Sequence, residues 1–140
     1  MRLWHKDLIS VLPRQQLLGQ WRELCCIASN IKNKNSPNHL LVNKVLDYSF
    51  LHFKFYCYIV INEMKKRGYK INEEKLLKNN VWEETNATIS NDDIFKDWHN
   101  ERYLKQCLYN LQEKYDCGGI SNEEWSKIAK NIKSFHFYLD

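Results

Sequence analysis

Hydrophobic residues recur at helical spacing along most of this chain. Between Pro13 and Ile31 the apolar positions fall three and four residues apart, at Leu17, Leu18, Trp21, Leu24, Cys25 and Ala28. The opposite face carries Gln15, Gly19, Arg22, Glu23 and Cys26. This pattern predicts an amphipathic helix with one buried face, and proline is well suited to the first turn of such a helix.

A second helical stretch is predicted from Leu40 to Arg67, with a bend near residues 47–49 and a stop at Gly68. Between Phe53 and Met64 nearly all positions are apolar, which is typical of a central, buried helix. The aromatic residues from Phe50 to Tyr58 are therefore expected in the core rather than on a base-stacking surface.

Three further helices are predicted after Gly68. Asn72 can cap a short helix that runs to Lys78, and residues 79–93 form a polar loop without periodicity. A hydrophobic stripe returns between Glu101 and Tyr115, at Tyr103, Leu104, Cys107, Leu108 and Leu111. Ser121 followed three residues later by Glu124 is a capping-box sequence, so the last helix should begin there.

Composition agrees with an all-α fold. Of the 140 residues 44% are hydrophobic, whereas only 4 are Gly and 2 are Pro, which disfavours both disorder and a turn-rich β-sandwich. A chain of this length can bury one substantial core, so we expect a compact single domain over residues 1–140.

Charged residues and cysteines narrow the class of protein further. No apolar run approaches the ~20 residues of a membrane span, because Lys54 and Glu63 lie in or beside the most apolar stretch, and no signal peptide is evident. We therefore expect a cytoplasmic protein without a membrane partner.

The five cysteines show no Cys-x-x-Cys spacing and should be buried free thiols. No His, Asp or Glu cluster has metal-ligand spacing, so we expect no metal and no cofactor.

Positive charge is concentrated in the first half. Residues 1–70 contain twelve Lys or Arg and four Asp or Glu, whereas residues 71–140 contain nine and thirteen. A basic half of this kind is typical of proteins that bind a polyanion, since neutralising phosphates releases counterions. An ordinary solvated surface remains the alternative interpretation of the charge alone.

The start of the chain combines three groups that suggest chemistry on DNA: the α-amine of Met1, the neighbouring Arg2, and the Arg22-Glu23 pair on the first long helix. An α-amine has a reference pKa of about 7.7–8.0 and is partly neutral and nucleophilic near pH 7. Such an amine can open a sugar through a Schiff base, and a carboxylate can then promote elimination of a phosphate. Without further support, the Arg22-Glu23 pair is an ordinary surface ion pair.

Several blocks of sequence resemble the pyrimidine dimer DNA glycosylases of the phage endonuclease V type and their bacterial relatives. They are residues 1–9 (MRLWHKDLI), residues 12–23 (LPRQQLLGQWRE) and residues 63–69 (EMKKRGY). Residues 103–111 (YLKQCLYNL) are similar to a segment of the bacterial branch. The first two blocks are specific, because their distance from the terminus matters for the mechanism.

The resemblance implies an all-helical fold with the N-terminal segment threaded into the body, and a monomer that acts on damaged double-stranded DNA. In this interpretation the Met1 amine forms an imine with the damaged nucleotide, and Glu23 removes the neighbouring proton. The DNA contacts would come from Arg2, Arg22, Arg14, His39 and Lys44, although for His39 a structural hydrogen-bonding role is the favoured interpretation. The predicted activity is that of a glycosylase with an associated abasic-site lyase.

The chain departs from the phage pattern at three places. Arg2 is bulky and disfavours removal of Met1, Cys26 replaces an expected arginine, and the tail, residues 137–140, is not basic. Pyrimidine dimers are the default lesion, with another damaged base or an abasic site as alternatives. A non-catalytic helical DNA-binding or protein-interaction module is the second hypothesis, and it predicts salt-dependent DNA binding without imine trapping. A metal-dependent nuclease is disfavoured.

Overall fold

The regular elements of the protein are helices. The computed structural model describes residues 2–33, 40–77 and 87–132, and no β-strand occurs in these ranges. The described ranges contain six α-helices, α1 (Arg14–Asn33), α2 (Leu40–Leu46), α3 (Phe50–Lys66), α4 (Glu74–Leu77), α5 (Glu101–Asp116) and α6 (Asn122–Asn131), and two short 3-10 helices, η1 (Lys6–Val11) and η2 (Asn91–Asp93). The all-α prediction is confirmed, and none of the described helices is long and apolar enough to cross a bilayer.

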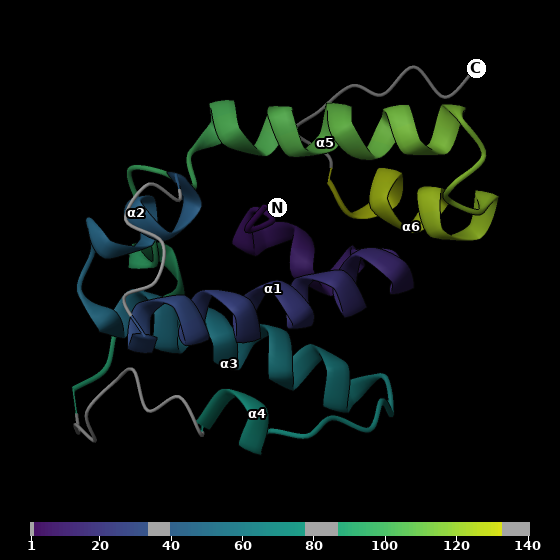
Figure 1. Ribbon diagram of the computed structural model, residues 1–140. Coiled ribbons are helices and arrows are strands. Elements are labelled where there is room, and N and C mark those ends of the chain that lie inside the picture. Colours follow the sequence, from purple (N-terminus) through teal and green to yellow (C-terminus); the bar gives the residue numbers. More distant parts are fainter. Residues whose placement is uncertain (1, 34–39, 78–86, 133–140) are drawn as a thin grey trace.

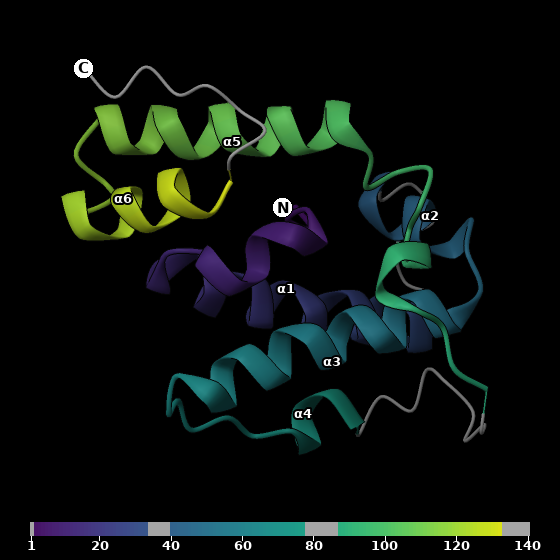
Figure 2. The same ribbon diagram turned by 180° about the vertical axis from the view of Figure 1, so that it is seen from behind.

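The helices enclose the segment that precedes α1. In both views of the ribbon this segment and η1 lie between α1 and α3 on one side and α5 and α6 on the other (Figures 1 and 2). Helix η1 contacts both α3 and α6, while α1 contacts α2, α3 and α4. The segment is buried accordingly, with Leu3, Leu8, Ile9 and Leu12 almost inaccessible to solvent. Helix η1 is not among the elements predicted from the sequence, and Met1 lies outside the described residues.

The long helical stretch predicted from Leu40 to Arg67 is two helices, α2 and α3. The bend expected near residues 47–49 is a complete break, and Ser49 has extended backbone angles as the N-cap of α3. Helix α3 contributes one face to the core, where Phe53 and Tyr56 are inaccessible to solvent. The core assignment is wrong for Phe50 and Tyr58, which are 44% and 39% exposed, because α3 also has a solvent-facing side.

Predicted helix boundaries are well reproduced elsewhere. Helix α3 stops at Gly68, whose φ of +82° is a left-handed conformation that glycine adopts readily. The capping box at Ser121 and Glu124 is present at the start of α6. Glu124 also accepts a hydrogen bond of 2.8 Å from the backbone nitrogen of Arg14, so α6 is attached to the start of α1. The short helix expected to end at Lys78 is α4, and the polar loop lies largely outside the described residues.

Candidate active site

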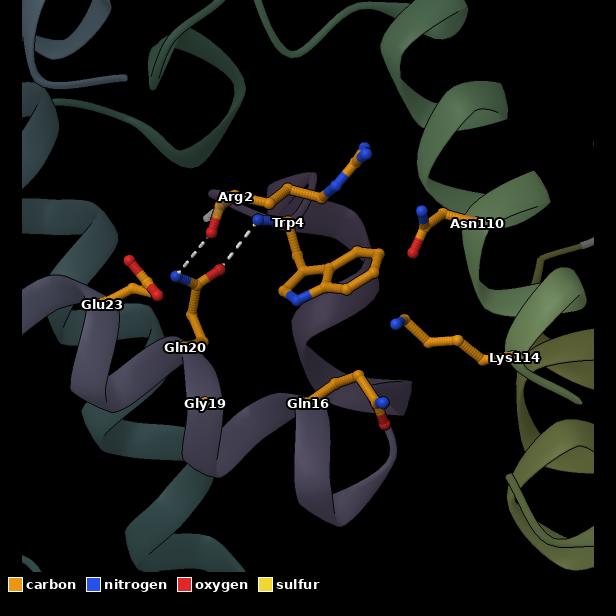
Figure 3. A pocket seen from close by; sticks show the side chains of 8 residues that line it. All are labelled: Arg2, Trp4, Gln16, Gly19, Gln20, Glu23, Asn110 and Lys114. Atoms are coloured by element: carbon orange, nitrogen blue, oxygen red, sulfur yellow. Dashed lines mark hydrogen bonds between the residues drawn. The ribbon is translucent and has the colours of Figure 1, made fainter. Parts of the chain in front are cut away.

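A pocket of about 360 Å³ lies between α1, α5 and the N-terminal segment. Figure 3 shows Glu23 on the α1 side, two residues of α5 on the opposite side and the Trp4 ring between them. The residues that line it are Arg2, Trp4, Gln16, Gly19, Gln20, Glu23, Asn110 and Lys114. The pocket therefore combines residues that are up to 112 positions apart in the chain.

Glu23 supplies the only carboxylate among the described residues of this lining. It lies on the same face of α1 as Gln16 and Gln20, because positions three, four and seven residues apart are neighbours on a helix. Its side chain is half-buried, and its buried Oε2 accepts no hydrogen bond from the described part of the protein. Such an acceptor is available to a ligand hydrogen or to a proton.

Arg2 places positive charge at the same pocket. Its guanidinium carbon is 5.4 Å from the centre of the Trp4 ring, close enough for a cation–π interaction. Its Nη1 lies 3.9 Å from the sulfur of Cys107 on α5. Trp4 itself is only 7% exposed, so its ring is a rigid wall of the pocket rather than a mobile surface group.

The second wall of the pocket comes from Asn110 and Lys114, which the sequence analysis missed. They lie four residues apart on α5, so both face the same direction. Figure 3 shows the Lys114 side chain extending towards Trp4. Their polar character and spacing are shared by many exposed helix positions, so nothing in the sequence distinguished them from surface residues.

The structure brings together two of the residues that the sequence analysis selected, Arg2 and Glu23. Arg22 is exposed and does not line the pocket, although it precedes Glu23. Arg14 is exposed at the start of α1, with its guanidinium 5.3 Å from the ring centre of Tyr69. Lys44 is exposed on α2. His39, like Met1, lies outside the described residues.

A pair of buried histidines lies beside the N-terminal segment. Nε2 of His5 donates to the carbonyl oxygen of His99 over 2.9 Å, and the backbone N–H of Lys6 donates to Nδ1 of His99 over 2.9 Å. Burial is the main cause that lowers the pKa of His99 to about 2, with smaller contributions from His5 in its protonated form and from the positive charge of Lys6. Burial also lowers the pKa of His5. Both imidazoles are therefore neutral at physiological pH and act as hydrogen-bonding groups.

The cysteines and potential metal ligands are dispersed. All five cysteines are free thiols, and the expectation of burial holds for Cys57 and Cys107 but is wrong for Cys26 and Cys117, which are exposed. Cys25 is half-buried. Within residues 2–33, 40–77 and 87–132, no three His, Cys, Asp or Glu side chains converge to hold a metal ion.

Comparison with known proteins gives one match. A family model described as pyrimidine dimer DNA glycosylase matches residues 1–77, which include Arg2, Glu23 and the first three blocks named above. No curated protein and no solved structure matches the chain. The matched range is more than half of the sequence and contains most of the pocket lining, but it ends before Asn110 and Lys114. The chain belongs to the pyrimidine dimer DNA glycosylase family.

Proposed function

We propose that this protein excises a damaged base, a pyrimidine dimer by default, from double-stranded DNA and then cleaves the strand at the resulting abasic site. The observation that carries the proposal is that Arg2 and Glu23 line one pocket, although 21 positions separate them. Arg2 is bonded directly to the residue that carries the α-amine, so this amine and a carboxylate can act on the same nucleotide.

The first step in this proposal is attack of the neutral α-amine on C1′ of the damaged nucleotide. The bond from C1′ to the base breaks, the base leaves with a proton, and the C1′–O4′ bond then opens as O4′ takes a proton from the nitrogen. The product is an imine that links C1′ to the protein. An α-amine suits this role because its reference pKa of about 7.7–8.0 leaves a useful neutral fraction near pH 7.

Glu23 is the proposed base in the second step. It removes a proton from C2′, next to the imine, and the released electron pair forms the C2′–C3′ double bond as the 3′ phosphate leaves. The free Oε2 of Glu23 supports this role, because no described residue donates a hydrogen bond to it. Arg2 and Lys114 carry positive charge at the same pocket and are suited to bind the flanking phosphates.

Borohydride trapping tests this proposal directly. The protein is mixed with a duplex that contains one cyclobutane dimer, and separately with a duplex that contains one abasic site, and borohydride is added. We expect a covalent adduct at the α-amine of residue 1 that disappears when the terminus is chemically blocked. Glu23→Gln should retain the adduct but lose strand cleavage. Glu113→Gln, which changes an exposed carboxylate on α5, is the matched control and should cleave like the wild type.

Two results would overturn the proposal. Salt-dependent DNA binding without an adduct on either duplex would indicate the non-catalytic DNA-binding module. Cleavage that a chelator abolishes would indicate a metal-dependent nuclease instead of an imine mechanism.

A further inference from the structure

One buried side chain of α1, that of Gln20, hydrogen-bonds the backbone of both Arg2 and Trp4. Its Nε2 donates to the carbonyl oxygen of Arg2 over 3.1 Å, and its Oε1 accepts from the backbone N–H of Trp4 over 2.8 Å. Gln20 is 1% exposed, and both of its polar atoms are bonded. One side-chain amide therefore holds the backbone of the N-terminal segment at two residues.

Two tyrosines complete this attachment from other helices. The hydroxyl of Tyr103, on α5, donates to the carbonyl oxygen of Leu3 over 2.5 Å. The hydroxyl of Tyr56, on α3, lies 2.6 Å from the carbonyl oxygen of Trp4 and 3.0 Å from Oε1 of Gln20. Burial raises the pKa of both phenols, so both remain protonated donors.

Three consecutive carbonyl groups, those of residues 2–4, thus each accept a side-chain hydrogen bond, and the three donors come from three different helices. This segment belongs to no helix or strand, so these bonds replace the regular pairing that would otherwise hold its backbone. Hydrophobic packing alone would bury the segment equally well. The directional hydrogen bonds also fix where the backbone of this segment lies relative to the three helices. Such positioning matters for catalysis because a displacement of about 1 Å can lower the rate about 100-fold.

We propose that Gln20, Tyr56 and Tyr103 form a backbone clamp that positions the α-amine for its reaction at the pocket. The inference rests on the proposed function. Gln20 and Glu23 lie three residues apart on the same face of α1, so the clamp and the proposed base belong to one rigid helix. The clamp thereby fixes the distance between the amine-bearing end of the chain and the carboxylate before DNA binds.

Gln20→Glu tests the clamp with minimal change of shape. The introduced carboxyl can still accept from Trp4, but in its ionised form it places an oxygen against the carbonyl of Arg2 instead of a donor. We expect the single-turnover rate of adduct formation on abasic DNA to fall at least tenfold relative to the wild type, with Kd for that DNA changed less than threefold. The defect should grow as the pH rises, because the protonated carboxyl can still donate to Arg2. Gln106→Glu, at an exposed position of α5, is the matched control and should leave the rate unchanged.

Tyr103→Phe provides a second test that introduces no buried charge. It removes the hydroxyl that bonds Leu3 and that also interacts with Arg2 and Cys107, while the ring can keep its packing against His5 and His99. We expect a smaller fall in the adduct rate, with no added pH dependence and with Kd again nearly unchanged. Each variant is assayed well below its own thermal midpoint, so that loss of folded protein does not contribute.

The outcomes separate this inference from the proposed function. Wild-type adduct rates in folded Gln20→Glu and Tyr103→Phe would show that the clamp is merely structural, and a defect confined to Kd would assign it to DNA binding. Either result overturns the inference and leaves the proposed function standing. A wild-type protein that forms no adduct overturns the proposed function itself, and this inference with it.

Discussion

Gln20 and Glu23 lie on the same face of α1 but differ in their hydrogen bonding. Both line the pocket from α1, yet Gln20 uses both ends of its amide, whereas Oε2 of Glu23 accepts nothing from the described residues. Leaving a buried acceptor without a donor costs about 1–3 kcal/mol, so such a group is rarely retained without a reason. The contrast fits the proposed roles, in which Gln20 holds the backbone of the N-terminal segment and Glu23 acts on the substrate.

Two glycines should respond oppositely to the same substitution. A Cβ added at Gly19 or at Gly68 would meet nothing within 4 Å, so steric crowding does not distinguish them. Gly19 lies within α1, where alanine is favoured by about 1 kcal/mol, whereas Gly68 has a φ of +82° that costs other residues about 1–2 kcal/mol. We expect Gly19→Ala to raise the free energy of unfolding and Gly68→Ala to lower it, as measured by urea denaturation. Changes of the same sign would contradict this account.

At the scale of elements, Arg67 joins the end of α3 to the end of η1. Its Nη1 donates to the carbonyl of Leu12 over 2.8 Å, and its Nη2 lies 3.4 Å and 3.3 Å from the carbonyls of Ile9 and Ser10. These carbonyls lie where the 3-10 helix ends, and that of Ile9 also accepts a bond from the backbone N–H of Leu12 over 3.4 Å. A planar guanidinium can bind several such carbonyls at once. The interaction orients the segment that leads from η1 into α1.

Replacing Arg67 should therefore weaken the junction between these elements. We expect Arg67→Gln to lower the free energy of unfolding by about 2–3 kcal/mol, since hydrogen bonds from a charged donor contribute about 1.5–3 kcal/mol and Glu63, 9% exposed, loses its nearby cation. Chemical denaturation measures the change. Lys66→Gln, one position earlier and exposed, is the control and should stay within about 0.5 kcal/mol of the wild type. Equal effects of the two substitutions would argue against the junction.

At the scale of the whole molecule, the buried histidines connect the first residues of the chain to the segment before α5. His5 and His99 stack with ring centres 5.1 Å apart, and His99 also accepts from the backbone of Lys6. Tyr56 and Tyr103, two members of the clamp, pack against His99. Protonation of His5 or His99 would place a positive charge in the buried interior, which disfavours charged groups.

Stability should consequently fall in mild acid. The folded protein keeps the pKa of His99 at about 2, whereas a histidine in the unfolded chain titrates near 6.5. Below pH 6.5 the unfolded state binds more protons, so the free energy of unfolding decreases as the pH falls. His99 alone accounts for an expected loss of about 2 kcal/mol between pH 7 and pH 5. Urea denaturation at both pH values measures it, and His99→Gln should remove the part that His99 contributes even if its stability at pH 7 is lower. His5, whose pKa burial also lowers, contributes in the same direction and remains.

The residues that line the pocket come from both inside and outside the range that matches the family model. Arg2, Trp4 and Glu23 lie within residues 1–77, whereas Asn110 and Lys114 lie beyond them. Helix α5 also supplies Tyr103 to the clamp. The second half of the molecule therefore completes the site that the first half begins.

The helices and their limits followed from local patterns in the sequence. Apolar spacing predicted α1, α3, α5 and α6, the Ser121 to Glu124 motif predicted a capping box, and Gly68 marked the end of α3. These features depend on residues within a few positions of each other, so no knowledge of distant contacts is required. Arg2 and Glu23 were found by their types and by their distance from the start of the chain, and both line the pocket.

Tertiary structure alone decided which residues of different helices meet. Glutamine is a polar residue that is mostly found at the surface, but folding buries Gln20 against Arg2 and Trp4, where both its Nε2 and its Oε1 are hydrogen-bonded. Lys114 becomes a pocket residue only because α5 packs across the N-terminal segment from α1. The spacing of neighbouring residues carries no information on which helices pack together. That packing is determined by how all the helices together bury the core. The elements are therefore a property of the sequence, and the site arises from their packing.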